Sequence, residues 1–295
     1  MSRARRPNGI ELEYVTAGSP SDPPMLLVMG FTAQLIAWPE ELIEQLVAAG
    51  FFVIRHDNRD CGLSSKIDGV EVDLMAVLTA LQTGDPTPLQ GKVPYTISDF
   101  SDDAFAVLDD LKIERAHIAG ASMGGMIVQA MAIAHPERVR SMTSIMSTTG
   151  EIEYGESTPE AQAALLAPPV LDRAGYIEAS TKAAIWSSKR YFDPEAAKAR
   201  AAASFDRSFY PEGIPRQLAA VMASPNRAEA LRSVTVPTLV IHGADDQLIT
   251  PSGGQRTADL VPDAKFLLID DMGHDLPIVL LPTIVEAIAA NAARG

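Results

Sequence analysis

The sequence predicts an α/β protein in which a mainly parallel sheet is covered by helices on both faces. Short apolar runs alternate with amphipathic helical stretches along most of the 295 residues, a pattern typical of parallel strands joined by helical crossovers. Hydrophobic residues make up 47% of the chain, enough to bury a large core. One large α/β domain with a subordinate piece therefore fits the sequence better than two equal domains.

The expected strands are short. Residues 10–15 alternate apolar and polar side chains, which predicts an edge strand, and residues 25–29 form a continuous apolar run, which predicts a buried one. Further strands are expected at 51–55, 116–119, 139–146, 236–242 and 265–269.

Helices are expected where apolar residues recur on one face. Residues 40–49 show this spacing, and so do residues 99–111, which we expect Ser98 to cap. A helix after the strand at 116–119 ends at His135 because a proline follows it. The last helices are expected at 255–260 and 281–293.

Two regions interrupt the alternation. Residues 67–94 carry glycine and proline among apolar residues, and residues 150–227 are alanine-rich, helical in bias and broken by prolines. Neither contains an evident strand. We expect 1–149 and 228–295 to form the core, with 67–94 as a small insertion near the site and 150–227 as a helical cap.

A nucleophile motif follows the expected strand at 116–119. Gly120-Ala121-Ser122-Met123-Gly124 has the form G-x-S-x-G between a strand and an apolar helix. Such a turn holds the serine in a strained conformation, and the helix N-terminus brings backbone N–H groups beside it. The alternative is a glycine-rich turn with an incidental serine. The context favours Ser122 as a catalytic nucleophile.

A serine needs a general base, and the chain has five histidines. His274 stands in a loop just past the expected strand at 265–269, at the sheet edge where open α/β proteins place their sites. A loop histidine is more often a surface residue, but with Ser122 present we expect His274 to be the base. The carboxylate that orients it should follow the strand at 236–242, where Asp245 and Asp246 both satisfy the chain order Ser, Asp, His.

An oxyanion needs two hydrogen-bond donors. The residue after the nucleophile supplies one, the backbone N–H of Met123. The other is expected from the loop after the strand at 25–29, and we choose the N–H of Phe31, with Gly30 letting the backbone approach the substrate.

These motifs together resemble the α/β-hydrolase fold over nearly the whole chain. The resemblance includes residues 26–30, the Arg59-Asp60-Cys61-Gly62-Leu63-Ser64 turn, the motif around Ser122, residues 236–241 and Gly273-His274. It implies Asp246 as the acid, because Gly243, Asp246 and Pro251 fit the pattern of such enzymes. Met29 stands where many members have histidine. Met29-Gly30, Trp38-Pro39 and 121–124 are similar to aclacinomycin-methylesterase-type enzymes.

The predicted function is cleavage of a carboxylic ester through an acyl-enzyme, with water and a small-molecule ester as substrates. The resemblance implies a methyl ester of a bulky or aromatic acid. A C–C bond hydrolase or cofactor-free haloperoxidase would use the same triad, and a small-molecule receptor with a vestigial triad is the non-enzyme alternative. Trp186 is the first candidate for substrate contact in the helical cap.

The composition narrows the possible partners. The net charge of −14 gives no footprint for nucleic acid and disfavours anionic membranes. Cys61 is the only cysteine and no apolar leader is evident, so we expect a cytoplasmic protein. No metal-ligand spacing or phosphate loop appears, so neither metal nor cofactor is expected. The oligomeric state stays open.

Overall fold

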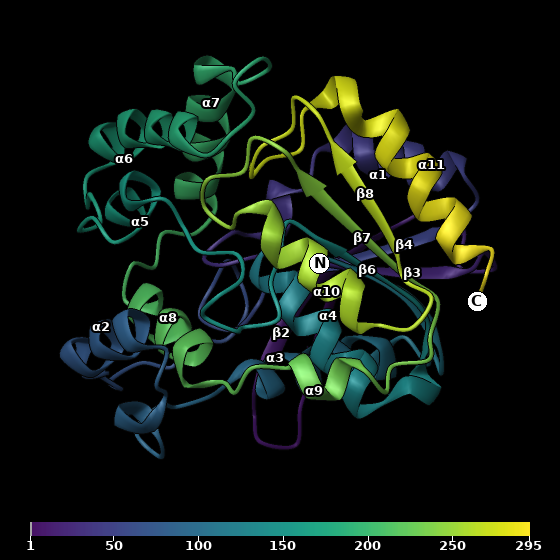
Figure 1. Ribbon diagram of the computed structural model, residues 1–295, viewed down its shortest axis with the longest axis horizontal. Helices are drawn as coiled ribbons and strands as arrows, with labels where there is room; N and C mark the ends of the chain where they lie inside the picture. The colour runs from purple at the N-terminus through teal and green to yellow at the C-terminus, as the bar shows by residue number, and fades with distance from the viewer. Residues whose placement is uncertain (1) are drawn as a thin grey trace.

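An eight-stranded sheet forms the centre of the computed structural model, which describes residues 2–295 (Figure 1). The strand order is β1-β2-β4-β3-β5-β6-β7-β8, with β1, β2 and β4 antiparallel and the remaining pairs parallel. The predicted fold class is therefore confirmed. The strands are β1 Ser2–Arg5, β2 Glu11–Ala17, β3 Pro24–Val28, β4 Phe52–His56, β5 Ala116–Ala121, β6 Val139–Ile145, β7 Thr238–Gly243 and β8 Lys265–Ile269.

Helices bury a separate apolar core on each face of this sheet. α1 (Glu40–Ala48) and α11 (Leu281–Ala292) cover one face, and α3 (Ile97–Asp110) and α4 (Met123–Ala134) cover the other. The second face also carries α9 Ala228–Leu231 and α10 Pro251–Leu260. Parallel strands covered on both faces end at one common edge, and their carboxyl-end loops gather there.

A second group of helices lies beside that edge, to the left of the sheet in Figure 1. The chain between β6 and β7 forms four of them: α5 Pro159–Leu165, α6 Arg173–Ala179, α7 Pro194–Arg207 and α8 Gly213–Ala223. The earlier insertion forms α2 (Leu74–Thr83), and its buried Ala76, Val77 and Ala80 pack with Ala219 of α8 in a third apolar cluster. The two insertions are thus in contact.

Two sequence expectations were wrong in detail. Residues 10–15 were expected at the sheet edge, but β1 lies outside β2 and forms the edge. β1 is short and polar, and its Arg3 pairs with Glu11 and Glu13 across the strands, so hydrophobic periodicity did not reveal it. α3 is capped by Thr96, in a reciprocal arrangement with Asp99, and not by Ser98.

None of the helices within residues 2–295 combines the length and the apolar character that crossing a bilayer requires.

Candidate active site

Ser122 occupies the sharp turn between β5 and α4. Its backbone has φ 57° and ψ −121°, a conformation that is strained for a residue with a side chain. Glycines make the turn possible: a Cβ on Gly120 would lie 2.1 Å from the Gly124 carbonyl oxygen, and one on Gly124 would lie 2.0 Å from that of Val28. The turn therefore presents Ser122 at the carboxyl edge of the sheet, with the start of α4 directly behind it.

His274 and Asp246 meet across two neighbouring loops of this edge. Nδ1 of His274 lies 2.7 Å from Oδ2 of Asp246. The other carboxylate oxygen, Oδ1, accepts hydrogen bonds from the backbone N–H groups of Leu248 and Ile249 at 2.9 and 3.0 Å. Because these bonds fix the carboxylate, they also fix the ring of His274, leaving Nε2 as the nitrogen that can face a substrate or a serine.

Asp245, the other candidate acid, points elsewhere. Its Oδ1 lies 3.1 Å from Nζ of Lys189, and its backbone N–H donates to the Met272 carbonyl. Of the two adjacent aspartates, the structure thus brings Asp246, which the resemblance implied, and not Asp245 into contact with His274.

A second histidine that the sequence analysis did not assign to the site touches the same carboxylate. Nε2 of His242 lies 3.4 Å from Oδ2 of Asp246 and 2.8 Å from the carbonyl oxygen of Ile249. Burial raises the pKa of the Asp246 carboxyl, but the charge of His274 and the hydrogen bonds of both histidines outweigh it, so the pKa is lowered overall. Asp246 is therefore ionised at neutral pH. The signal available in the sequence was the spacing, since His242, near the end of β7, stands four residues before Asp246.

Ser122 and His274 line the same cavity. Among residues 2–295, however, no hydrogen bond joins Oγ of Ser122 to the imidazole. In enzymes without bound substrate this bond is often long and tightens only when substrate arrives. The geometry thus gives both side chains access to the same cavity.

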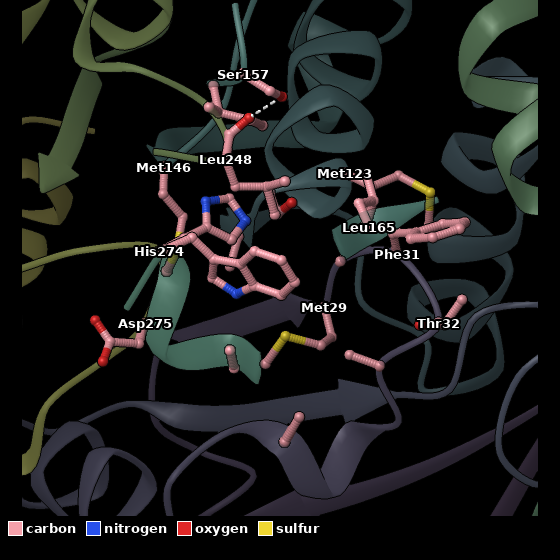
Figure 2. Close-up of a pocket in the computed structure, with 18 of the residues that line it drawn as sticks. Met29, Phe31, Thr32, Met123, Met146, Ser157, Leu165, Leu248, His274 and Asp275 are labelled. Atoms are coloured by element: carbon pink, nitrogen blue, oxygen red, sulfur yellow. Dashed lines mark hydrogen bonds between the residues drawn. The ribbon is translucent and has the colours of Figure 1, made fainter. Parts of the chain in front are cut away.

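Two backbone N–H groups beside Ser122 have no partner within the described chain, those of Phe31 and Met123. Both residues line the cavity, and Figure 2 draws their side chains on the side of the pocket opposite His274. A Cβ on Gly30 would lie 2.9 Å from Cβ of Ser122, so the loop backbone passes directly against the nucleophile turn. Both N–H groups therefore remain free to donate a hydrogen bond beside Ser122.

The loop that carries Phe31 is held by side chains that the sequence analysis missed. Oε1 of Gln217, from α8, accepts the N–H of Thr32 at 2.8 Å, while its Nε2 donates to the Arg59 carbonyl at the same distance. Nδ2 of Asn58 donates to the Met29 carbonyl at 2.8 Å. Thr32 itself has φ 57°, so these bonds hold a strained loop. No local motif marks Gln217, which lies 185 residues from Thr32.

Trp186 lies against the loop of His274. Its carbonyl oxygen accepts the backbone N–H of His274 at 2.7 Å, and its half-buried side chain lines the cavity. A Cβ on Gly273 would lie 2.4 Å from the same carbonyl oxygen, so only glycine permits this approach. The backbone of Trp186 thus contacts the loop of His274, while its side chain forms part of the cavity wall.

The cavity has a volume of about 1560 Å³ and is lined by residues of both the sheet edge and the inserted helices. Its walls are mainly apolar, with Met29, Met146 and Leu165 among the side chains drawn in Figure 2. Ligand pockets usually measure about 300–1,000 Å³, so this one exceeds the usual range.

Fold and site together define the class. The chain belongs to the α/β-hydrolase fold family, whose model matches residues 23–279. It is 28% identical to rhodomycin D methylesterase DauP of Streptomyces sp. (strain C5), covering 93% of this chain and 92% of that protein. The predicted resemblance to methylesterases of this kind is confirmed.

Other relatives differ in activity. The putative non-heme bromoperoxidase BpoC of Mycobacterium tuberculosis (strain ATCC 25618 / H37Rv) is 26% identical, covering 85% of this chain and 86% of that one. Among solved structures, the enol-lactonase from Burkholderia xenovorans LB400 superposes with a TM-score of 0.73 at 23% identity, covering 97% and 98% of the two chains. That likeness supports the fold.

Proposed function

We propose that the chain is a serine hydrolase that cleaves a carboxylic ester through an acyl-enzyme. The observation that carries the proposal is the 2.7 Å contact between Asp246 and His274, beside a cavity that Ser122 also lines. A fixed, ionised carboxylate keeps a proton on Nδ1 and leaves Nε2 free to act as a base.

The proposed reaction has two halves. In the first, Oγ of Ser122 attacks the carbonyl carbon while Nε2 of His274 takes the hydroxyl proton, and the N–H groups of Phe31 and Met123 stabilise the oxyanion. The tetrahedral intermediate collapses, and the leaving alcohol receives the proton from Nε2. In the second half, water attacks the acyl-enzyme by the same route, which releases the acid and restores Ser122.

The proposed substrate is a methyl ester of a bulky or aromatic acid. The large apolar cavity suits such an acyl group, and the relatives that cleave rhodomycin D methyl esters, as their names state, support this choice. We also propose residues 150–227 as a cap that sets substrate size, since α5, α7 and α8 supply walls of the same cavity. Apolar walls on this side would limit the access of water to the reacting carbonyl.

The decisive experiment replaces the nucleophile. Ser122→Ala should lower kcat for p-nitrophenyl and methyl esters by several orders of magnitude, because it removes the attacking atom while the fold is kept. His274→Ala should lose about as much, and the double variant little more, since the two residues act as one unit. Turnover by Ser122→Ala within a few-fold of the parent protein, with contaminating esterase excluded, would overturn the proposal.

C–C bond hydrolysis is the second candidate, and one relative favours it. A 2-hydroxy-6-oxononadienedioate/2-hydroxy-6-oxononatrienedioate hydrolase of Cupriavidus pinatubonensis is 27% identical over 79% of this chain. A vinylogous diketone assayed beside methyl esters separates the two activities. Labelling of Ser122 by a fluorophosphonate without any turnover would instead indicate a receptor.

A further inference from the structure

Arg227 is a buried arginine at the end of the long insertion, just before α9. Only 8% of its surface is exposed. Its Nε donates to Oε1 of Gln129, and its Nη2 donates to the Thr148 carbonyl oxygen, both at 3.0 Å. Thr148 follows β6, the strand next to β5 and Ser122. The guanidinium is thus fixed beside the carboxyl edge of the sheet.

No carboxylate pairs with this guanidinium in the described part of the chain. The two groups that it contacts, an amide and a peptide carbonyl, are neutral. Burial alone lowers the pKa of Arg227 to about 10, and no opposing charge restores it. A buried charge is normally paired, because neutral partners do not offset the loss of hydration. The positive charge of Arg227 is therefore uncompensated.

Part of the guanidinium is left without a partner, and Arg227 stands in the wall of the cavity. Arg227 lines the cavity together with Thr148, Gly150 and Asn226. A guanidinium carries five N–H donors, of which the two bonds above use one on Nε and one on Nη2. Both N–H groups of Nη1 and one of Nη2 remain. These neighbouring donors are enough to bind the two oxygens of a carboxylate.

Other cationic side chains of the cavity wall differ from Arg227 in burial. Lys182 and Arg200 also line the cavity, but both are exposed, so water already solvates their charges. A neutral hydrogen-bond donor would be enough to bind both the Gln129 side chain and the Thr148 carbonyl. The two protein contacts of Arg227 thus do not require its positive charge. Because the surrounding walls are mainly apolar, the electric field of that charge is weakly screened in the cavity.

We propose that Arg227 binds a carboxylate of the substrate, one that is separate from the ester being cleaved. The natural substrate is then a half-ester: a bulky acid that carries one methyl ester and one free carboxylate. The inference rests on the proposed ester hydrolysis at Ser122 and specifies which esters that site selects. After cleavage the product is a dicarboxylic acid, whose second carboxylate remains on Arg227 while the new one leaves the serine.

The test compares isosteric substrates. The monomethyl esters of terephthalic, naphthalene-2,6-dicarboxylic and biphenyl-4,4′-dicarboxylic acids place the carboxylate at three distances from the ester. Each is paired with its carboxamide analogue, which has nearly the same shape and no charge. We expect kcat/KM to favour the carboxylate by at least about tenfold for at least one of the three spacings. Equal rates within all three pairs would overturn the proposal.

Variants assign the preference to Arg227. Arg227→Gln should remove the preference for the charged member of the pair while leaving kcat/KM for the carboxamide within about threefold. Arg200→Gln, which changes an exposed arginine of the same wall, should leave the ratio as it is in the parent protein. Equal losses on both members of the pair would make Arg227 a structural residue and overturn the proposal. Should Arg227→Gln not fold, Arg227→Lys keeps the charge but not the neighbouring donors of the guanidinium and should lower the ratio; an unchanged ratio overturns it.

A binding arm separates this inference from the proposed reaction. Calorimetry on Ser122→Ala protein measures the affinities of the half-ester and its carboxamide without turnover. If neither compound is hydrolysed by the parent protein but the half-ester binds at least about tenfold more tightly, ester hydrolysis is wrong and the carboxylate site stands. If esters are cleaved through Ser122 but the two affinities are equal at every spacing, the carboxylate site is wrong and the hydrolase stands.

Discussion

Asp246 is surrounded by four groups that hold its charge and its orientation. Two backbone N–H groups bind one oxygen, and two imidazoles approach the other, so a carboxylate that is only 2% exposed remains ionised. A buried carboxylate without such partners would be protonated at neutral pH. The same bonds select the tautomer of His274 in which Nδ1 carries the proton. At the scale of single residues, Asp246 and its hydrogen-bond partners therefore hold His274 in the orientation and tautomer that a base requires.

Replacing either aspartate separates the two candidates for the acid. Asp246→Asn should lower kcat by about 10⁴-fold, because the amide no longer selects the reactive tautomer of His274. Asp245→Asn should cost less than about tenfold, since it removes an ion pair with the exposed side chain of Lys189 and disturbs one hydrogen bond from the backbone N–H of that residue. Steady-state kinetics on a p-nitrophenyl ester measures both, with thermal unfolding as a check on folding. The opposite ranking would place the acid at Asp245.

The helix α8 links the inserted region to the oxyanion loop. Besides the bonds of Gln217, the guanidinium of Arg216 pairs with Asp60 through Nε and Nη2 at 2.7 and 3.0 Å. Both anchors join α8 to the turn that follows β4, next to the Thr32 loop. An element inserted more than 180 residues after Thr32 thus supports the backbone on which Phe31 is presented.

This link predicts a catalytic defect without a binding defect. Gln217→Met keeps the side-chain length but loses both hydrogen bonds, so kcat should fall about 10- to 100-fold while KM changes less than about threefold. The affinity of a boronic acid, which forms an oxyanion on Ser122, should fall in parallel with kcat. Gln217→Glu keeps an acceptor for Thr32 and should recover part of the rate.

Asn291→Leu is the matched control for Gln217→Met. Its buried amide also binds backbone carbonyls, those of Met142 in the middle of β6 and of Pro237 just before β7. It should lower the melting temperature and leave kcat and boronic-acid affinity alone. If both variants lose only stability, Gln217 has no positioning role.

Trp186 allows a test of the inserted helices. Trp186→Ala removes a large ring from the cavity wall but leaves the carbonyl that binds the N–H of His274. The ratio of kcat/KM between bulky aromatic methyl esters and p-nitrophenyl acetate should change by about tenfold, while the acetate rate changes little. Trp186→Phe, which keeps a ring, should lie between the two. A uniform loss on all esters would make Trp186 a packing residue only.

At the scale of the whole molecule, buried histidines link folding to pH. His117 of β5 is 4% exposed and bonds Oγ of Ser141 through Nδ1 at 2.9 Å. Burial, followed by the charges of Arg140 and Arg115, lowers the pKa of His117 from 6.5 to about 4. Burial also lowers the pKa of His56. Since the unfolded chain binds these protons more readily than the folded one, the histidines favour folding fully above pH 6.5, and this contribution declines as the pH falls toward 4.

The titration of His117 can be measured by urea unfolding at several pH values. The free energy of unfolding of the parent protein should fall between pH 7 and pH 4.5, and His117→Gln, which does not titrate there, should show a shallower fall. The difference between the two slopes isolates His117 from the many carboxylates of this acidic chain. Identical slopes would mean that His117 keeps its ordinary pKa in the folded state.

Local sequence was enough to predict the sheet and the nucleophile turn. Strand and helix periodicity, the glycines around Ser122 and the loop position of His274 act over a few residues, so the chain reveals them directly. The strand Lys265–Ile269 was predicted with its correct bounds. β1 was missed because a polar edge strand is stabilised by backbone pairing and ion pairs instead of apolar burial.

Tertiary structure alone revealed the other side chains that support that site. The resemblance already implied Asp246, but its contact with His274 depends on how two loops 28 residues apart meet. Gln217 and Arg227 reach Thr32 and Gln129 over 185 and 98 residues, and no periodicity or motif encodes such a pairing. The contacts of Gln217 follow from the packing of the inserted helix α8 against the sheet edge. Local patterns fix the conformation of the backbone. Which distant polar groups meet is decided by the burial of whole apolar faces, because the free energy of that burial is larger than the free energy of a single hydrogen bond.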